Sequence, residues 1–387
     1  MSLVRVVAVP IAASLMMGGV PPVLRAQSPR PNAQVASRLT PPLLTAAGDT
    51  GLAADAPERE APWVLRVVRS VEFTGFAAVQ GTARSVPGDA YTISAAELDA
   101  TAEFWPSLQG AIALARDGTQ MVVAAGFLDL HLGGARVAPR GKIFAERGMH
   151  LQAGRFDIPF GGDWQRFAPP DRGLSSAPAI TDIISDGGLN DDGVRAFSVG
   201  ARWNASAWLV RGALDGRAMG ARVALTPFSN PFVFRAPASE RPLEIGLSAH
   251  VDGREGKIVD QRAAVDVDVR RGDLNLAAEW QERRVVKEMA GLTVGRARGW
   301  HVSSEIPTPS VGWVSSLLVA RWESMRGDAL GTPELGDATQ LTRAVAGTRV
   351  ALGEWVLLKC EVGWRMGTTA ADVMPARSWL LDAVIRW

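Results

Sequence analysis

Apolar and polar residues alternate along short segments of the chain, from about Val71 to the last residue. The pattern is clearest in the final ten residues, S-W-L-L-D-A-V-I-R-W. One register of this stretch is mixed, and the other is entirely apolar: Trp379, Leu381, Ala383, Ile385 and Trp387. Successive side chains of a β-strand point to opposite faces, so a period of two predicts a strand. This strand would have one apolar face with an aromatic residue at each end.

Sixteen segments of this kind can be counted, most of them about ten residues long. Their bounds are 71–80, 96–105, 108–116, 120–132, 149–158, 193–203, 206–214, 218–227, 243–252, 261–270, 273–283, 297–306, 312–323, 343–352, 355–365 and 378–387. Strands with one apolar and one charged face are typical of transmembrane β-barrels, which expose one face to lipid and the other to a polar lumen. We therefore predict an all-β fold, a transmembrane antiparallel up-and-down β-barrel of about 16 strands. Fourteen or eighteen strands also fit, because predicted strand ends shift by about two to four residues.

The predicted connections support this topology. From the ninth segment onward, longer and shorter connections alternate: 253–260, 271–272, 284–296, 307–311, 324–342, 353–354 and 366–377. Outer-membrane barrels have long external loops and short periplasmic turns, so both ends of the barrel domain are expected on the periplasmic side. Two earlier connections, 133–148 and 228–242, are long where this pattern predicts short turns.

Tryptophan residues fall near the ends of the predicted strands. The chain has 13 of them and a single tyrosine, Tyr91. Membrane barrels carry two girdles of amphipathic aromatic rings, one at each interface. The periplasmic girdle is predicted to contain Trp203, Trp208, Trp313, Trp355 and Trp387. The outer girdle is predicted to contain Trp280, Trp300, Trp322, Trp364 and Trp379.

The first 70 residues follow a different pattern. Residues 1–26 contain Arg5, an apolar run and then Leu24-Arg25-Ala26, which together predict a secretory signal peptide. An N-terminal membrane anchor is the alternative. Residues 27–62 are rich in Pro, Ala and Ser, and we predict a flexible periplasmic leader over 27–70. The barrel domain then spans 71–387, and it contains no stretch of about 18 apolar residues that could form a membrane helix.

Charge and cysteine content exclude several classes of protein. The chain has 41 Lys and Arg residues against 40 Asp and Glu residues, whereas a nucleic-acid-binding protein would carry a basic excess. A single cysteine, Cys360, leaves no disulfide framework within one chain. No two histidines have the sequence spacing of metal ligands, so no metal site is expected. The four histidines are His131, His150, His250 and His301.

The sequence also contains no catalytic or cofactor-binding motif. It lacks the G-x-S-x-G elbow of serine hydrolases and the glycine-rich loop that binds phosphates. The serine pairs Ser175-Ser176 and Ser315-Ser316 have no nearby histidine with an orienting acid. A catalytic triad can assemble from distant positions, but nothing in the sequence points to one. We therefore expect no enzyme activity, no catalytic residues and no cofactor.

Two features could control passage through a barrel. The first is the charged face of the strands, which lines water in a barrel of this size. Both signs of charge occur there, so strong ion selectivity does not follow. The candidate pore-lining residues are Arg202, Arg211, Arg222, Glu244, His250, Asp266, Asp268, Arg270, Glu279, Lys359, Glu361 and Arg365.

The second feature is the long segment Pro159–Asp191 between the fifth and sixth predicted strands. Long loops within compact folds are usually functional. We predict that this loop folds into the barrel and narrows it, because its large apolar side chains need burial. A loop on the external surface is the alternative. The candidate constriction residues are Asp163, Arg166, Asp171, Arg172, Asp182 and Asp186.

The stretch Met149–Gly161, M-H-L-Q-A-G-R-F-D-I-P-F-G, resembles the strand before the long loop in the phosphate-selective porin O/P-like family. The matching residues are Gly154, Arg155, Pro159, Phe160 and Gly161. The stretch Asp191–Trp203 is similar to the next strand of that family. The resemblance implies a sixteen-strand, often trimeric, diffusion channel.

Phosphate selectivity in that family depends on basic residues concentrated along the pore. This chain has only four lysines, and its long loop is acidic. Arg202, Arg211 and Arg222 could form a partial basic strip on neighbouring strands. Phosphate specificity is therefore not expected to carry over.

Together these observations predict a porin in the outer membrane of a Gram-negative-type bacterium. It would allow small hydrophilic solutes or ions to diffuse passively through a water-filled barrel. Its expected partners are outer-membrane lipid, the solutes or ions themselves and two further copies in a homotrimer. The alternatives are a structural or adhesive outer-membrane barrel with a plugged lumen, and an exported soluble β-sandwich.

Overall fold

The computed structural model describes residues 68–83, 91–117, 120–132, 148–163, 168–212, 216–229, 242–254, 257–272, 274–286, 295–327, 340–366 and 377–387. The predicted signal peptide and the predicted leader up to residue 67 lie outside these residues. The candidate constriction residue Arg166 also lies outside them.

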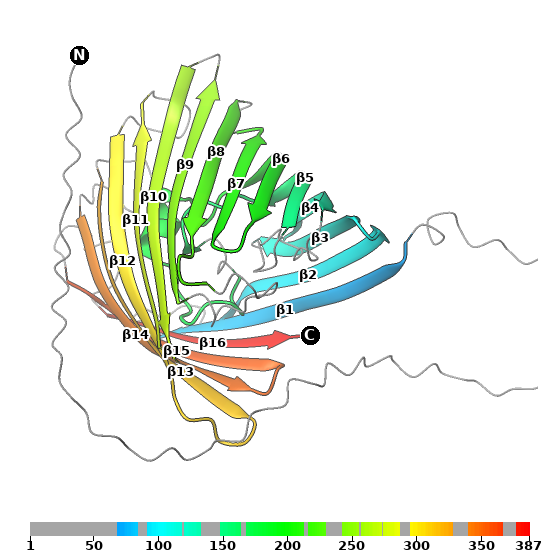
Figure 1. Cartoon of the computed structure of the whole chain (residues 1–387). Coiled ribbons are helices and arrows are strands. Elements are labelled where there is room, and N and C mark those ends of the chain that lie inside the picture. Colours follow the sequence, from blue (N-terminus) through cyan, green and yellow to red (C-terminus); the bar gives the residue numbers. More distant parts are fainter. Residues whose placement is uncertain are drawn as a thin grey trace, which may run out of the picture. The chain divides into compact units, whose positions relative to one another are not determined.

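Sixteen antiparallel strands form one closed barrel (Figure 1). Each strand pairs with its neighbours in sequence, and β1 pairs with β16 to close the ring. The strands are β1 Ser70–Ala83, β2 Tyr91–Trp105, β3 Leu108–Asp117, β4 Gln120–Leu132, β5 Gly148–Asp157, β6 Asn190–Val199, β7 Trp203–Val210, β8 Arg217–Leu225, β9 Leu243–Arg254, β10 Lys257–Arg271, β11 Leu274–Val285, β12 Gly295–Pro307, β13 Val314–Gly327, β14 Gln340–Leu352, β15 Val356–Arg365 and β16 Arg377–Arg386. The predicted fold class is confirmed, and the sandwich alternative is wrong because the sheet has no free edges.

The alternation of side chains separates the outer wall of the barrel from its interior. In β16, Leu381 and Ile385 are each 54% exposed, whereas Asp382 is 6% exposed and Val384 is fully buried. Large exposed apolar side chains recur on nearly every strand. An apolar outer wall of this extent is stable in lipid and would aggregate in water. The predicted outward direction of the apolar face in the last strand is therefore confirmed.

Nine of the ten tryptophans assigned to the girdles are exposed. Trp203, Trp313, Trp355 and Trp387 lie at strand ends or turns at the end of the barrel where β16 finishes. Trp280 and Trp300 face each other across β11 and β12 on the outer wall. The remaining three exposed girdle residues are Trp322, Trp364 and Trp379.

Trp208 is the exception, and its predicted place in the periplasmic girdle is wrong. The strand that carries it begins at Trp203 rather than at 206, so Trp208 lies five residues into β7. An interval of five places the two rings on opposite faces of a strand. Trp208 is 4% exposed and donates its indole N–H to Nδ1 of His250 across 3.1 Å in the interior.

The predicted connection 253–260 is also largely wrong. β9 continues to Arg254 and β10 begins at Lys257, so the strict alternation of connection lengths fails at this point. Asp260, which falls within the predicted connection, belongs to the inner wall instead. Asp260 is 2% exposed and forms ion pairs with Arg262 and Arg283. Charge does not mark a turn in a barrel whose interior is polar.

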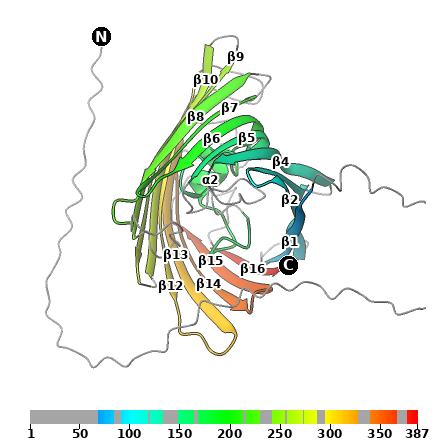
Figure 2. The ribbon, with the colours of Figure 1, turned by 45° about the vertical axis from the view of Figure 1, so that its right-hand side comes forward.

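The long connection between β5 and β6 carries a short helix, α2 (Ala179–Ile184). Figure 2 shows α2 within the ring of strands, where it packs against β11, β12 and β13. No helix in the described part of the chain has the length and hydropathy needed to cross a membrane.

Candidate functional site: an inward loop and a charged pocket

The loop between β5 and β6 is anchored to the interior by apolar packing. Ile180, Ile183 and Ile184 of α2 form a buried cluster with side chains of the inner wall. Their wall partners are Val285, Ala297, Met325 and Leu341. Burying an isoleucine side chain contributes about 1.5–3 kcal/mol, so this cluster favours the inward position of the loop.

Carboxylates of the wall also bind the loop backbone. Glu323 accepts a hydrogen bond from the Ala179 N–H at 2.7 Å. Glu361 accepts hydrogen bonds from the Ser176 N–H at 2.8 Å and from the Ser176 hydroxyl at 2.5 Å. These carboxylates thus satisfy backbone and side-chain donors of the segment just before and at the start of α2.

Three wall cations bind carbonyl oxygens of the same loop. Arg321 donates to the carbonyls of Ser176 and Ala177, each at 3.0 Å. Arg343 donates to Glu323 at 2.5 Å and to the Ala177 carbonyl at 3.2 Å. The Lys359 ammonium donates to the Pro169 carbonyl at 2.5 Å. Buried charges are costly unless they are paired and hydrogen-bonded, and the loop supplies that pairing.

A second anchor lies just after α2. Asp186 accepts hydrogen bonds from Arg262 and Arg283, each at 2.8 Å. The same two guanidinium groups pair with Asp260 at 3.0 and 2.9 Å. The loop is therefore fixed to the wall on both sides of its helix.

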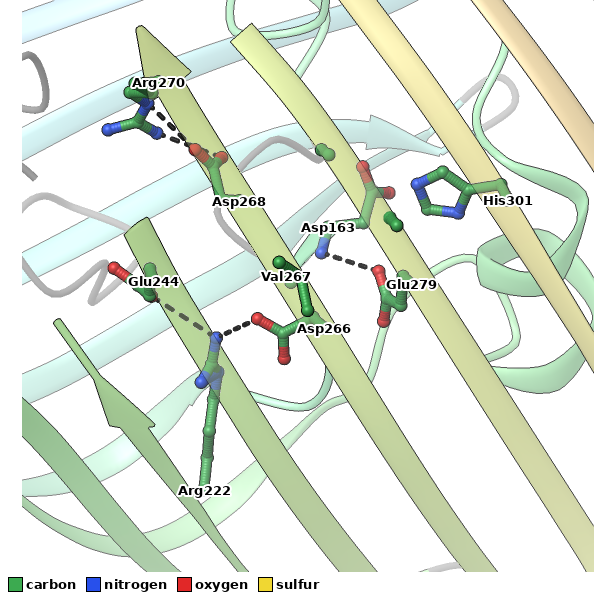
Figure 3. Close-up of a pocket in the computed structure, with 12 residues that line it drawn as sticks. Asp163, Arg222, Glu244, Asp266, Val267, Asp268, Arg270, Glu279 and His301 are labelled. Carbon is green, nitrogen blue, oxygen red and sulfur yellow. Dashed lines mark hydrogen bonds and ion pairs between the residues drawn. The ribbon is translucent and has the colours of Figure 1, made fainter. Parts of the chain in front are cut away.

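A pocket of about 570 Å³ of empty space, open to solvent, lies between the start of the loop and β8 to β12 (Figure 3). Arg222 forms ion pairs with Asp266 at 2.6 Å and with Glu244 at 3.5 Å. Arg270 pairs with Asp268 at 3.0 Å. The charged side chains that line the pocket are Asp163, Arg222, Glu244, Asp266, Asp268, Arg270 and Glu279.

Gly161 joins the loop to this pocket. Its N–H donates to the Ser248 hydroxyl at 3.1 Å, and its carbonyl accepts a hydrogen bond from Arg222 Nε at 3.1 Å. The next polar contact is from the Asp163 N–H to Glu279 at 3.2 Å. Gly161 has a φ of 73°, and a Cβ atom there would lie 1.9 Å from Glu279 Oε1. Only glycine allows this close approach without strain.

The lining of the pocket is predominantly acidic, with five carboxylates and two guanidinium groups beside His301. Fixed charges around a water-filled opening bias which ions enter it. On the loop itself, desolvation inside the barrel raises the pKa of the Asp182 carboxyl. Nearby Arg172, Arg343 and Arg321 oppose this shift.

The structure places the candidate pore-lining residues at several separate positions in the barrel. Six of them meet at the pocket: Arg222, Glu244, Asp266, Asp268, Arg270 and Glu279. Lys359 and Glu361 lie under the loop and hold it. His250 is buried against Trp208, and Arg365 is half-buried at the end of β15.

The predicted basic strip does not form. Arg202 lies in the turn before β7, and Arg211 lies just after its last residue, so the two are at opposite ends of that strand. Arg211 is exposed and lies 3.9 Å from Asp192. Arg222, the third member, is engaged by acidic partners inside the barrel. The expectation failed because the predicted strands around β7 were displaced by about three residues.

Among the candidate constriction residues, Asp163 and Arg172 pair at 3.3 Å, whereas Asp186 serves as an anchor. Asp171 lies on the same stretch and is exposed. Sequence reasoning missed several anchoring residues of the wall. They are Arg262, Arg283, Glu323 and Arg343. For Arg262 and Arg283 the signal was present in the strand register, since they share parity with the predicted inward residues Asp266 on β10 and Glu279 on β11.

A closed barrel with an apolar outer wall, exposed tryptophans and a charged interior defines an outer-membrane β-barrel. Such a wall belongs in the outer membrane, where barrels of this kind span the bilayer. No protein-family model matches the sequence, and no curated protein matches it. The resemblance to the phosphate-selective porin family is therefore not confirmed.

Solved structures show what the fold is similar to. OmpF of Salmonella typhi, in complex with daunomycin, matches with a TM-score of 0.54 at 12% identity, over 82% of this chain and 97% of OmpF. An anion-selective porin from Comamonas acidovorans matches with a TM-score of 0.52 at 13% identity, over 82% of this chain and 98% of the porin. The outer-membrane channel DcaP of Acinetobacter baumannii matches with a TM-score of 0.51 at 11% identity, over 82% of this chain and 97% of DcaP. At these identities the likeness establishes a shared fold.

Proposed function

We propose that the protein is a porin that lets small hydrophilic solutes and ions diffuse passively across the outer membrane. The observation that carries the proposal is the position of the loop between β5 and β6. It lies inside the barrel against one part of the wall and borders an open, charged pocket. A constriction formed by a loop and charged walls limits the size of a solute while allowing water through.

Three observations support this assignment over a plugged structural barrel. The segment of the loop around α2 is held by contacts with β10 to β15, whereas the pocket lies at the start of the loop and is lined by β8 to β12. The pocket is open to solvent and its lining is charged, which favours water and ions. Solved porins and channels share the fold.

The acidic lining further suggests a weak preference for cations, because carboxylates outnumber guanidinium groups at the pocket. The arginines beside them limit that preference. Phosphate is a poor candidate for a specific solute, since the predicted basic strip does not form. The protein would act as a homotrimer; one solved form of Vibrio cholerae OmpT with the same fold is described as a trimer.

A liposome swelling assay tests solute diffusion directly. Vesicles that contain the purified barrel should swell in isotonic arabinose or glucose faster than empty vesicles, and more slowly in larger sugars. Swelling that equals that of empty vesicles for every sugar would contradict the proposal and favour the plugged barrel. Folded protein in the vesicles is verified by its shifted migration on a gel without boiling.

A further inference from the structure

Two histidines and an aspartate come together on the inner wall, away from the pocket. Asp129 and His131 lie on β4, and His150 lies directly opposite His131 on β5. Residues two apart on a strand share a face, and directly opposed residues on paired strands have Cβ atoms about 4.5–5.5 Å apart. All three side chains are therefore directed to one point. Asp129 is fully buried, and each histidine is 7% exposed.

The donor atoms of these residues are spaced almost as metal ligands are. Nδ1 of His131 lies 3.2 Å from Asp129 Oδ2, and Nδ1 of His150 lies 3.0 Å from the same oxygen. One potential ligand atom from each residue lies within 4.8 Å of the other two. Zinc bonds to nitrogen and oxygen are about 2.0–2.2 Å long, so ligand atoms in a tetrahedral site are about 3.3–3.6 Å apart. Small side-chain rotations would therefore suffice to bind a metal ion.

The surroundings hold this geometry in place. The imidazole of His150 stacks on Phe197, with ring centroids 4.3 Å apart and planes 6° apart. The amide of Gln152 faces Asp129 across the strand pair and is bound by Arg195. Arg195 also donates to the Asp157 carbonyl. The Arg195 guanidinium is thus directed at the oxygen atoms of Gln152 and Asp157. Metal ligands that are fixed by neighbours in this way lose less freedom on binding.

We propose that Asp129, His131 and His150 form a binding site for a divalent transition metal, with zinc as the best fit. Two imidazole nitrogens and one carboxylate suit zinc, whereas calcium and magnesium prefer oxygen ligands. Water from the lumen would supply the fourth ligand, since each histidine retains 7% exposure. A network of hydrogen bonds without metal is the competing explanation. It would bring both Nδ1 atoms to a single carboxylate oxygen.

Calorimetric titration of untagged, metal-stripped protein in detergent with zinc chloride tests this proposal. The wild type should bind one zinc ion per chain, and Asp129→Asn and His150→Gln should each weaken binding by at least about tenfold. The chain offers a matched control in His301→Gln, an inward-facing histidine on β12 outside the cluster. This control should bind zinc as the wild type does. Each variant is tested for folding by its migration without boiling.

A second measurement covers the case in which the variants fail to fold. Cobalt added to the wild type should give visible absorption bands of a tetrahedral or five-coordinate site, and zinc should displace them. No saturable zinc binding, an unaffected His150→Gln variant, or loss of binding in His301→Gln would overturn the proposal. Absence of the cobalt bands in the wild type would overturn it as well. Because neither assay records conduction, their results are independent of the proposed channel function.

Discussion

Two constraints, a positive φ and a lack of space for a side chain, favour glycine at position 161, and mutations can separate their effects. The φ of Gly161 is 73°, and the carboxylate of Glu279 occupies the space where a Cβ atom would lie. Gly187 has nearly the same φ, 75°, but a Cβ atom there would meet nothing within 4 Å. Backbone strain alone costs about 1–3 kcal/mol, and Gly161→Ala adds a steric conflict to it.

We therefore expect Gly161→Ala to destabilise the folded barrel more than Gly187→Ala. The free energy of unfolding in urea, measured in lipid vesicles, provides the comparison. Gly161→Ala should also increase the noise of single-channel currents, since the start of the loop must move away from Glu279. Equal destabilisation by the two substitutions would show that the contact with Glu279 is unimportant.

Glu244 tests the electrostatic effect of the pocket. It lines the pocket and lies 3.5 Å from Arg222, which also pairs with Asp266. Removing its charge should lower the permeability ratio of potassium to chloride. The shift should be partial, because four other carboxylates remain.

Reversal potentials of Glu244→Gln in a salt gradient measure this ratio. Arg211→Gln is a suitable control, because Arg211 lies beyond the end of β7 and not at the pocket. A ratio that changes as much in the control as in Glu244→Gln would refute a specific effect of the pocket.

Arg321 on strand β13 holds the loop against the wall. It donates hydrogen bonds to two loop carbonyls and is 6% exposed. Removing one member of a buried charge network costs about 3–5 kcal/mol. Arg321→Ala should therefore loosen the loop without opening the barrel. Limited proteolysis of the folded protein should then cleave within 159–191, and the mean conductance should rise.

Arg326→Ala provides the control on the same strand, since Arg326 is exposed. It should leave both proteolysis and conductance unchanged. If Arg321→Ala were as resistant to protease as the wild type, the hydrogen bonds from Arg321 would not be what holds the loop.

The strands and their facing could be predicted from sequence because a membrane barrel imposes one rule on every element. Each outward side chain meets lipid and each inward side chain meets a polar interior, so the period of two recurs from β1 to β16. It is interrupted only where the strand register shifts, as between Ile258 and Asp260. The ends of the strands were predicted less accurately than their facing. The stretch 253–260 was predicted as a connection, although Asp260 within it pairs with Arg262 and Arg283 inside the barrel.

The contacts between the loop and the wall could not be predicted, because they join residues more than 100 positions apart. Glu323 and Ala179 are an example. The grouping of Asp129, His131 and His150 was missed for another reason. Histidine spacing was judged by intervals along the sequence, whereas in a sheet the ligands come from alternate residues of one strand and from the strand beside it.

Closure of the whole barrel depends on its last residues. The backbone of Trp387 exchanges hydrogen bonds with Gly75 of β1, at 3.0 and 3.1 Å. Its indole also lies against Gly75, where a Cβ atom would come within 2.7 Å of the ring. A chain that lacks residues 377–387 would leave β1 and β15 with unpaired edges in lipid, which is costly.

That truncated chain should fail to refold, and boiling should no longer change its migration on a gel. The full chain refolded in the same detergent is the control. A truncated protein that still migrates differently with and without boiling would show that fifteen strands suffice to close the barrel.

Conductance of single barrels in a planar bilayer tests most directly whether the molecule is an open channel narrowed by its inward loop. We expect discrete, stable current steps at high salt, with a weak cation preference and larger steps for Arg321→Ala. Correctly folded protein that inserts into the bilayer and gives no current steps would contradict this expectation.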